Sequence, residues 1–171
     1  VNLTTVIYAL FGAYMILMYI FSTLQHALTN YVAKSVFNRL SHIWTFLSIG
    51  IAYSAYTITK IQGIAGWVLF GIVTALSLFG VILCAITGTR YEKLLNTIYG
   101  VTGFSGLCAC KILYDVLSAK SFSMLILAAI FYVIGFVFYN LKKVKFMHSI
   151  GNIMMLAGSV YMFFSLFFIN K

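Results

Sequence analysis

The sequence predicts an all-α membrane protein, a bundle of transmembrane helices, from three observations. Of its 171 residues, 63% are hydrophobic and only 8% are charged, whereas roughly a quarter of the residues of a soluble domain are charged. The apolar residues form runs of about 20, the length that a helix needs to cross a bilayer. The gaps between these runs are too short to hold a soluble domain. Because backbone groups in hydrocarbon must be satisfied within their own segment, such runs are helices rather than barrel strands.

Six apolar runs follow one another, and we interpret the whole chain, 1–171, as a single transmembrane domain. The first run ends at His26, the second stops before Lys60, and the third stops before Arg90. Val1 stands only a few residues before the first run, an abrupt beginning that suggests a missing upstream portion. The helices are predicted near 5–26, 41–59, 64–87, 94–113, 121–140 and 147–169.

The net charge of +9 comes from eleven Lys and Arg residues against two acids, Glu92 and Asp115. The basic residues lie in the gaps between apolar runs, so we assign them to membrane orientation and expect no nucleic-acid partner. Seven of them fall on one side and four on the other, which predicts that the heavier side is cytoplasmic and that the C-terminus lies outside. The heavier side carries Lys34, Arg39, Arg90, Lys93, Lys142, Lys143 and Lys145, and the lighter side carries Lys60, Lys111, Lys120 and Lys171.

The three histidines of the chain are predicted to gather at the cytoplasmic edge of the membrane. His26 ends the first helix, Ser41 and His42 begin the second, and His148 begins the last. Composition does not force this gathering, because other helix ends were open to these residues. Ionisable groups inside a membrane are costly and usually functional. We therefore expect a polar pocket at this edge.

Two residue pairs in this pocket have the chemistry of a metal site. Ser22 and His26 lie at i and i+4, as do His148 and Asn152, so each pair shares one helix face. Imidazole is a common zinc ligand, and catalytic zinc typically keeps three protein ligands and a water. His26 and His148 are the stronger ligand candidates and Asn152 is the weaker one, because amide oxygen suits zinc less well. Zinc is the candidate cofactor, and neither carboxylate of the chain is placed to act as a general base.

The same residues also have simpler interpretations than a metal site. His26 and His148 also fit interfacial side chains that snorkel or hydrogen-bond within the bundle. Ser22 and Asn152 equally fit hydrogen bonds between helices. The lysines of 142–145 are explained by topology alone, although such a cluster also binds anionic lipid head groups. Membrane lipids are the expected partners in every case.

Several stretches, in this order and at these spacings, together resemble one known family. They are Ser22-Thr-Leu-Gln-His26, Phe37-Asn-Arg-Leu-Ser-His42 with the run to Tyr53, Gly66-Trp67, and Tyr139-Asn-Leu-Lys through Phe146-Met-His148. These stretches resemble the hemolysin III family, the bacterial branch of the progestin and adipoQ receptor group of seven-helix membrane proteins. The resemblance covers nearly the whole chain.

The resemblance implies a zinc site on the cytoplasmic side, built by a histidine ending the family's second helix and an H-x-x-x-H pair in its seventh. Our six helices would match the family's helices two to seven, with its first helix absent here. His26 then matches the second-helix histidine, Ser22 the serine before it, and His148 the first histidine of the pair. Ser41 stands where the family has the aspartate thought to hold the metal-bound water. Asn152 stands where it has the second histidine.

The resemblance also implies what the chain does. The family name implies a cytolytic or pore-forming activity, and the wider relatives look like lipid-amide hydrolases or receptors. In the hydrolase interpretation, metal-activated water would attack a lipid amide or ester. His26 and His148 would hold the metal, with Asn152 as a weak third ligand. Ser41 and Ser22 would be the catalytic hydroxyls, with Ser41 positioning the water. The alternative is a pseudoenzyme, a receptor-like or lipid-binding scaffold without catalysis.

Overall fold

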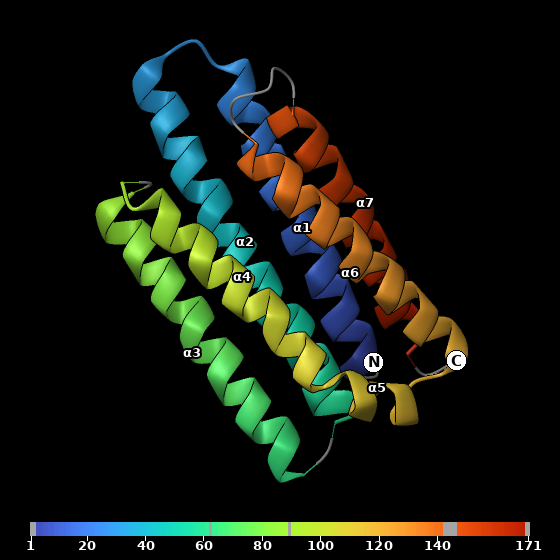
Figure 1. Ribbon diagram of the computed structural model, residues 1–171. Helices are drawn as coiled ribbons and strands as arrows, with labels where there is room; N and C mark the ends of the chain where they lie inside the picture. The colour runs from blue at the N-terminus through green and yellow to red at the C-terminus, as the bar shows by residue number, and fades with distance from the viewer. Residues whose placement is uncertain (1–2, 62, 89, 142–146, 170–171) are drawn as a thin grey trace. The chain divides into compact units, whose positions relative to one another are not determined.

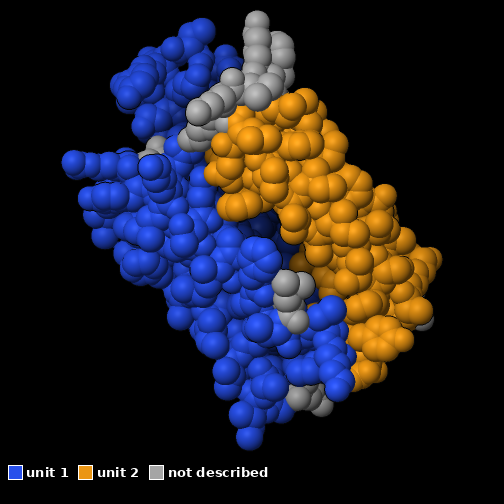
Figure 2. Space-filling view, viewed as in Figure 1, with its two compact units in different colours: residues 1–112 blue, residues 113–171 orange. Residues whose placement is uncertain are grey.

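The computed structural model describes residues 3–61, 63–88, 90–141 and 147–169. All regular structure in these ranges is helical, which confirms the predicted all-α class (Figure 1). The helices fall into two compact units, residues 1–112 and residues 113–171 (Figure 2). The helices are α1 Leu3–Ala27, α2 Tyr31–Thr59, α3 Ile64–Thr87, α4 Glu92–Cys108, α5 Cys110–Val116, α6 Ala119–Asn140 and α7 Met147–Phe167.

The first unit is built around α2, which packs against both α1 and α3, while α3 packs against α4. Its core contains Phe46 from α2, Cys84 from α3, and Leu95 and Ile98 from α4, all fully or almost fully buried. Gly80 of α3 lies against the Phe46 ring, so closely that a Cβ at this position would stand 2.5 Å from two ring carbons. Large and small residues thus interlock where α2 meets α3.

The second predicted helix was placed too late, because α2 begins at Tyr31 and not near 41. Asn30 is the N-cap, and its side-chain oxygen accepts hydrogen bonds from the backbone N–H groups of Val32 and Ala33 at 2.9 and 3.2 Å. Asparagine is among the best residues at this position. The polar turns that follow interrupt the apolar run but not the helix, so Ser41 and the residues after it lie well inside α2.

The fourth predicted helix, near 94–113, is broken in two. α4 ends at Cys108 and α5 begins at Cys110, with Ala109 between them donating its backbone N–H to the Gly106 carbonyl at 3.1 Å. The tightened turn lies just beyond the point where the Tyr53 hydroxyl donates to the backbone carbonyl of Thr102 at 2.8 Å. Side chains inserted against a helix's carbonyls are a known cause of such breaks.

The second unit is dominated by the close pairing of α6 and α7. Small residues make this possible: a Cβ at Gly151 would stand 2.6 Å from the Tyr139 backbone nitrogen, and one at Gly135 would stand 3.0 Å from the Gly151 carbonyl oxygen. Two fully buried serines bridge the same helices, because Ser121 Oγ donates to the Ser165 carbonyl at 2.9 Å and Ser165 Oγ donates to the Ser121 carbonyl at 2.7 Å.

Within the described residues, four helices are long and apolar enough to cross a membrane, and many apolar side chains are exposed. The four segments belong to α1, α3, α6 and α7. Ile86, Phe104 and Ile153 are 76, 64 and 61% exposed, which is costly in water and favourable in lipid. The chain is therefore a multi-pass membrane protein. The candidate spans, by length and hydropathy, are Thr5–Ala27, Ile64–Thr87, Ala119–Asn140 and Ser149–Phe167.

Candidate functional site

Ser22 and His26 lie at the end of α1, where the sequence predicts them. His26 is in the last turn of the helix, and Ser22 is one turn earlier. The His26 side chain is exposed and that of Ser22 is half-buried. Because residues at i and i+4 share a helix face, the end of α1 presents an imidazole with a hydroxyl below it.

Ser41 lies in the interior of α2 and its hydroxyl is bonded to its own helix. Ser41 Oγ donates to the Asn38 carbonyl at 2.9 Å, and the Thr45 hydroxyl donates to the Ser41 carbonyl at 2.8 Å. Hydroxyls in helices commonly bond back to the preceding turn in this way. The hydroxyl proton of Ser41 is therefore used within α2.

His42 faces the interior of the first unit, between α2 and α4. Its side chain is only 8% exposed, and its Nδ1 lies 2.9 Å from the hydroxyl oxygen of Tyr99. The Tyr99 hydroxyl also donates to the His42 carbonyl at 3.3 Å, and the Tyr99 ring stacks on Phe46 with 4.3 Å between centroids. The pairing joins residues 57 positions apart, so no local pattern predicts that Tyr99 belongs here.

Tyr53 makes a second polar contact between α2 and α4, which the sequence analysis missed. Its hydroxyl donates to the Thr102 carbonyl at 2.8 Å and to the Gly103 carbonyl at 3.2 Å, and the Ser105 hydroxyl lies 3.5 Å from it. A Cβ at Gly106 would stand 2.6 Å from the Tyr53 hydroxyl oxygen. Because Gly106 has no side chain, the Tyr53 hydroxyl can lie against α4. A glycine at this point of an apolar helix is the sequence feature that indicates such a close approach.

His148 and Asn152 lie at the start of α7, in the second unit. His148 falls in the first turn, as predicted, and Asn152 follows at i+4 with a half-buried side chain. The neighbouring Gly151 is buried against α6. The structure therefore holds Ser22 with His26 on one helix and His148 with Asn152 on another, in separate units.

The donor chemistry of these residues does not fit a hydrolytic zinc centre. Such a centre needs three good ligands, a bound water and a base that takes its proton. The predicted ligands are two imidazoles and one amide oxygen. His42 contacts the Tyr99 hydroxyl, and the Ser41 hydroxyl donates its hydrogen bond within α2. Among the residues that the structure describes, no three His, Cys, Asp or Glu side chains come together as metal ligands.

Comparison with known proteins places the chain in a family. A model of the family described as "Haemolysin-III related" matches residues 2–165. The hemolysin-3 homolog of Bacillus subtilis is 34% identical over 161 residues, which cover 94% of this chain and 76% of that protein. The hemolysin-3 of Bacillus cereus is 31% identical over 163 residues, covering 95% of this chain and 74% of that protein. No solved structure matches significantly. The chain belongs to the hemolysin III family of integral membrane proteins.

Proposed function

We propose that this chain is a non-hydrolytic membrane protein of the hemolysin III type, a lipid-binding or receptor-like scaffold that keeps a degenerate version of the zinc pocket. The observation that carries the proposal is the state of Ser41, whose hydroxyl donates to the Asn38 carbonyl of its own helix. A carboxylate at this position would accept a proton or a hydrogen bond from a metal-bound water. The Ser41 hydroxyl oxygen can still accept a hydrogen bond, but unlike a carboxylate it is not a base that takes the proton of a metal-bound water.

For zinc, we propose only weak binding by this chain. His26, His148 and Asn152 are the residues that would hold the ion, and what zinc supplies when bound is a positive charge that polarises its ligands and water. His26 and His148 are the better ligands, and Asn152 adds a weak amide oxygen. With this ligand set, we expect weak binding and no activated water.

The first test is the zinc content of the purified chain, measured by elemental analysis after dialysis against a mild chelator. We expect well under one zinc per chain. The double variant Ser41→Asp with Asn152→His restores the carboxylate and the third imidazole, so it is expected to retain more zinc. The double variant Ser41→Asn with Asn152→Gln is the matched control, since it changes both positions without adding a strong ligand. A wild-type chain that keeps one zinc, and loses it in His148→Ala, would contradict the proposal.

We also propose an orientation of the chain in the membrane. The polar pocket is placed at the cytoplasmic face and the C-terminus outside, because seven basic residues fall on one side of the predicted topology and four on the other. The positive-inside rule gives the heavier side to the cytoplasm.

Membrane lysis is a second candidate function, favoured by the names of the relatives. The proteins from B. subtilis and B. cereus are described as a hemolysin-3 homolog and a hemolysin-3. If this chain opens membranes, reconstituted protein should release dye from liposomes in proportion to the protein added. The His148→Ala variant should leak equally, because lysis does not need the metal pocket. Dye retention equal to that of liposomes carrying an inactive helical membrane protein would exclude lysis.

A further inference from the structure

Three basic residues of the first unit, one from α2 and two from around the start of α4, lie near the C-terminal end of α3. Arg39 reaches from α2 to the end of α3, where its Nη1 donates to the Ala85 carbonyl at 3.5 Å. Its Nη2 lies 3.0 Å from the position that a Cβ on Gly88 would occupy. Arg90 comes two residues after Gly88, and Lys93 is in the first turn of α4. We call Arg39, Arg90 and Lys93 the basic cluster, and all three side chains are exposed.

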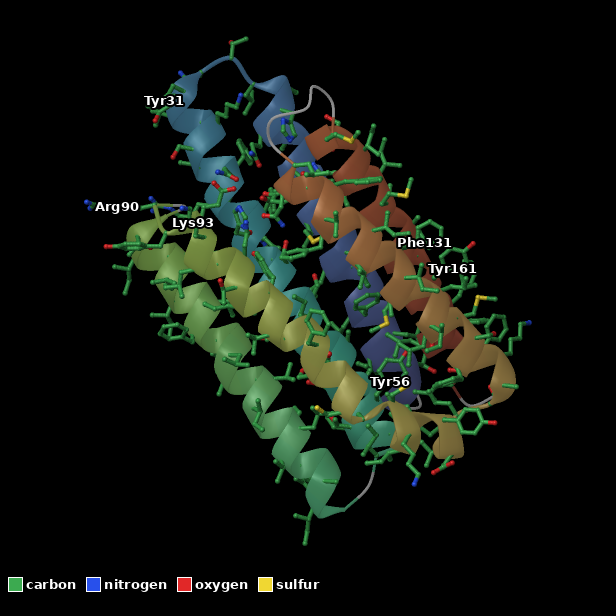
Figure 3. All side chains as sticks on the ribbon, viewed as in Figure 1. Tyr31, Tyr56, Arg90, Lys93, Phe131 and Tyr161 are labelled. Carbon is green, nitrogen blue, oxygen red and sulfur yellow. The ribbon has the colours of Figure 1, made fainter. Side chains whose placement is uncertain are left out.

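Gly88 allows Arg39 to approach the end of α3 closely. It is the C-cap of α3 with a φ of 64°, and its backbone N–H donates to the Cys84 carbonyl at 2.9 Å. Glycine is the residue that adopts this left-handed conformation without a steric penalty. Because it also lacks a Cβ, the Arg39 guanidinium can approach the turn. The guanidinium therefore lies beside Gly88. Arg90 and Lys93 lie around the start of α4 (Figure 3).

Exposed apolar side chains border the cluster. Ile86 in the last turn of α3 is 76% exposed, and Tyr91 and Leu94 at the start of α4 are 49 and 43% exposed. The Arg90 guanidinium carbon lies 6.0 Å from the centre of the Tyr91 ring. Cations beside an aromatic ring and aliphatic side chains, at the end of a membrane-spanning helix, are typical of the head-group region of a bilayer.

We propose that the basic cluster binds the phosphate group of an anionic phospholipid. Arginine presents a planar fork of donors that matches two phosphate oxygens, and lysine adds a point charge. Glu92 lies between Arg90 and Lys93 in the sequence, and one acid against three cations leaves the cluster positive. The acyl chains of the same lipid would lie along Ile86 and Leu94. The apolar border is what favours a lipid over free phosphate, and the proposal is independent of the zinc pocket.

The test compares lipids on the intact protein in detergent. Short-chain phosphatidylglycerol is titrated against the chain of residues 1–171 and binding is counted by native mass spectrometry, with phosphatidylcholine and inorganic phosphate as comparison probes. The double variant Arg90→Gln with Lys93→Gln removes two cations of the cluster. Lys60→Gln with Lys111→Gln removes two cations from the other end of α2 and from α5, and is the matched control. Arg39→Lys keeps the charge of the third position but removes its planar fork.

We expect phosphatidylglycerol to bind more tightly than phosphatidylcholine. Each exposed cation near a membrane surface is worth about fivefold in binding, so the cluster variant should lose on the order of tenfold or more while the control changes by less than about twofold. Arg39→Lys should weaken binding by a smaller factor. Three results would each overturn the proposal: equal binding of the two lipids, an equal loss in the control, or full competition by millimolar inorganic phosphate, which would indicate a free-phosphate site. An unchanged thermal transition of each variant without lipid confirms that it folds.

Discussion

Two polar side chains of α2 make hydrogen-bond contacts with α4 in the interior of the first unit. His42 contacts the Tyr99 hydroxyl, and Tyr53 donates to the Thr102 carbonyl. Both contacts run from α2 to α4, two helices that meet through few other polar groups in the described residues. In hydrocarbon, hydrogen bonds between helices are worth about 0.6 kcal/mol on average and up to about 1.7 kcal/mol. We therefore interpret the two tyrosines as the polar links that hold α4 against α2.

Removing the Tyr99 hydroxyl tests this interpretation. Tyr99→Phe keeps the ring that stacks on Phe46 and removes the oxygen 2.9 Å from His42 Nδ1. We expect a loss of stability of about 0.6 to 1.7 kcal/mol, measured by denaturation in mixed micelles and followed by helical circular dichroism. Tyr114→Phe is the matched control, because this tyrosine is 67% exposed. Equal losses of stability in the two variants would show that the contact between Tyr99 and His42 does not stabilise the fold.

The sequence predicts the place of some site residues and misses the surroundings of others. His26 at the end of α1 and His148 at the start of α7 are found where the apolar runs place them. Ser41 was placed at a helix start and lies inside α2 instead, because the N-cap at Asn30 extends the helix through a polar stretch. The partners of His42 and Tyr53 depend on contacts between distant helices, which one helix's periodicity does not encode.

Helix packing in the second unit depends on backbone contact between α6 and α7. Gly151 and Gly135 lie where either Cβ would meet backbone atoms of the other helix within 3.0 Å. Tyr132 and Ser159 add a hydrogen bond of 2.9 Å between the same two helices. Close approach of this kind is the main source of packing energy between helices in lipid, where apolar burial gives little.

A methyl group at Gly151 should separate α6 from α7. In Gly151→Ala the new Cβ would stand 2.6 Å from the Tyr139 backbone nitrogen, and backbone cannot move aside as a flexible side chain can. We expect a destabilisation of about 1 to 3 kcal/mol, the usual cost of overpacking, in the same denaturation assay. Gly71→Ala is the control, since apart from the adjoining backbone of its own helix no atom lies within 4 Å of its Cβ position. The stability of this variant should be unchanged or raised by up to about 1 kcal/mol. A tolerated Gly151→Ala would mean that α6 and α7 are not in this contact.

At the level of elements, helix type was predictable and helix ends were not always so. The runs near 64–87 and 121–140 correspond closely to α3 and α6, because both are apolar throughout and bounded by polar residues. The run near 94–113 is interrupted at Ala109, beyond the point where Tyr53 of another helix contacts α4. We interpret this contact as the reason for the interruption, and the hydropathy of the run carries no sign of a contact with a distant helix.

For the whole molecule, composition and family agree. The charge content of 8% predicts a membrane protein. Four helices in the described part of the chain are long and apolar enough to cross a bilayer, and the family model matches residues 2–165. The family's zinc chemistry does not follow automatically, because function depends on particular side chains rather than on the fold. Ser41 and Asn152 are the two positions at which this chain departs from the pattern of ligands that the family resemblance implies.

The zinc content of the purified wild-type chain, set beside that of Ser41→Asp with Asn152→His, tests the central claim most directly. We predict that the wild type retains well under one zinc per chain after dialysis against a mild chelator, and that the double variant retains more. One zinc per wild-type chain that survives this treatment and disappears in His148→Ala would contradict the claim that the pocket is degenerate.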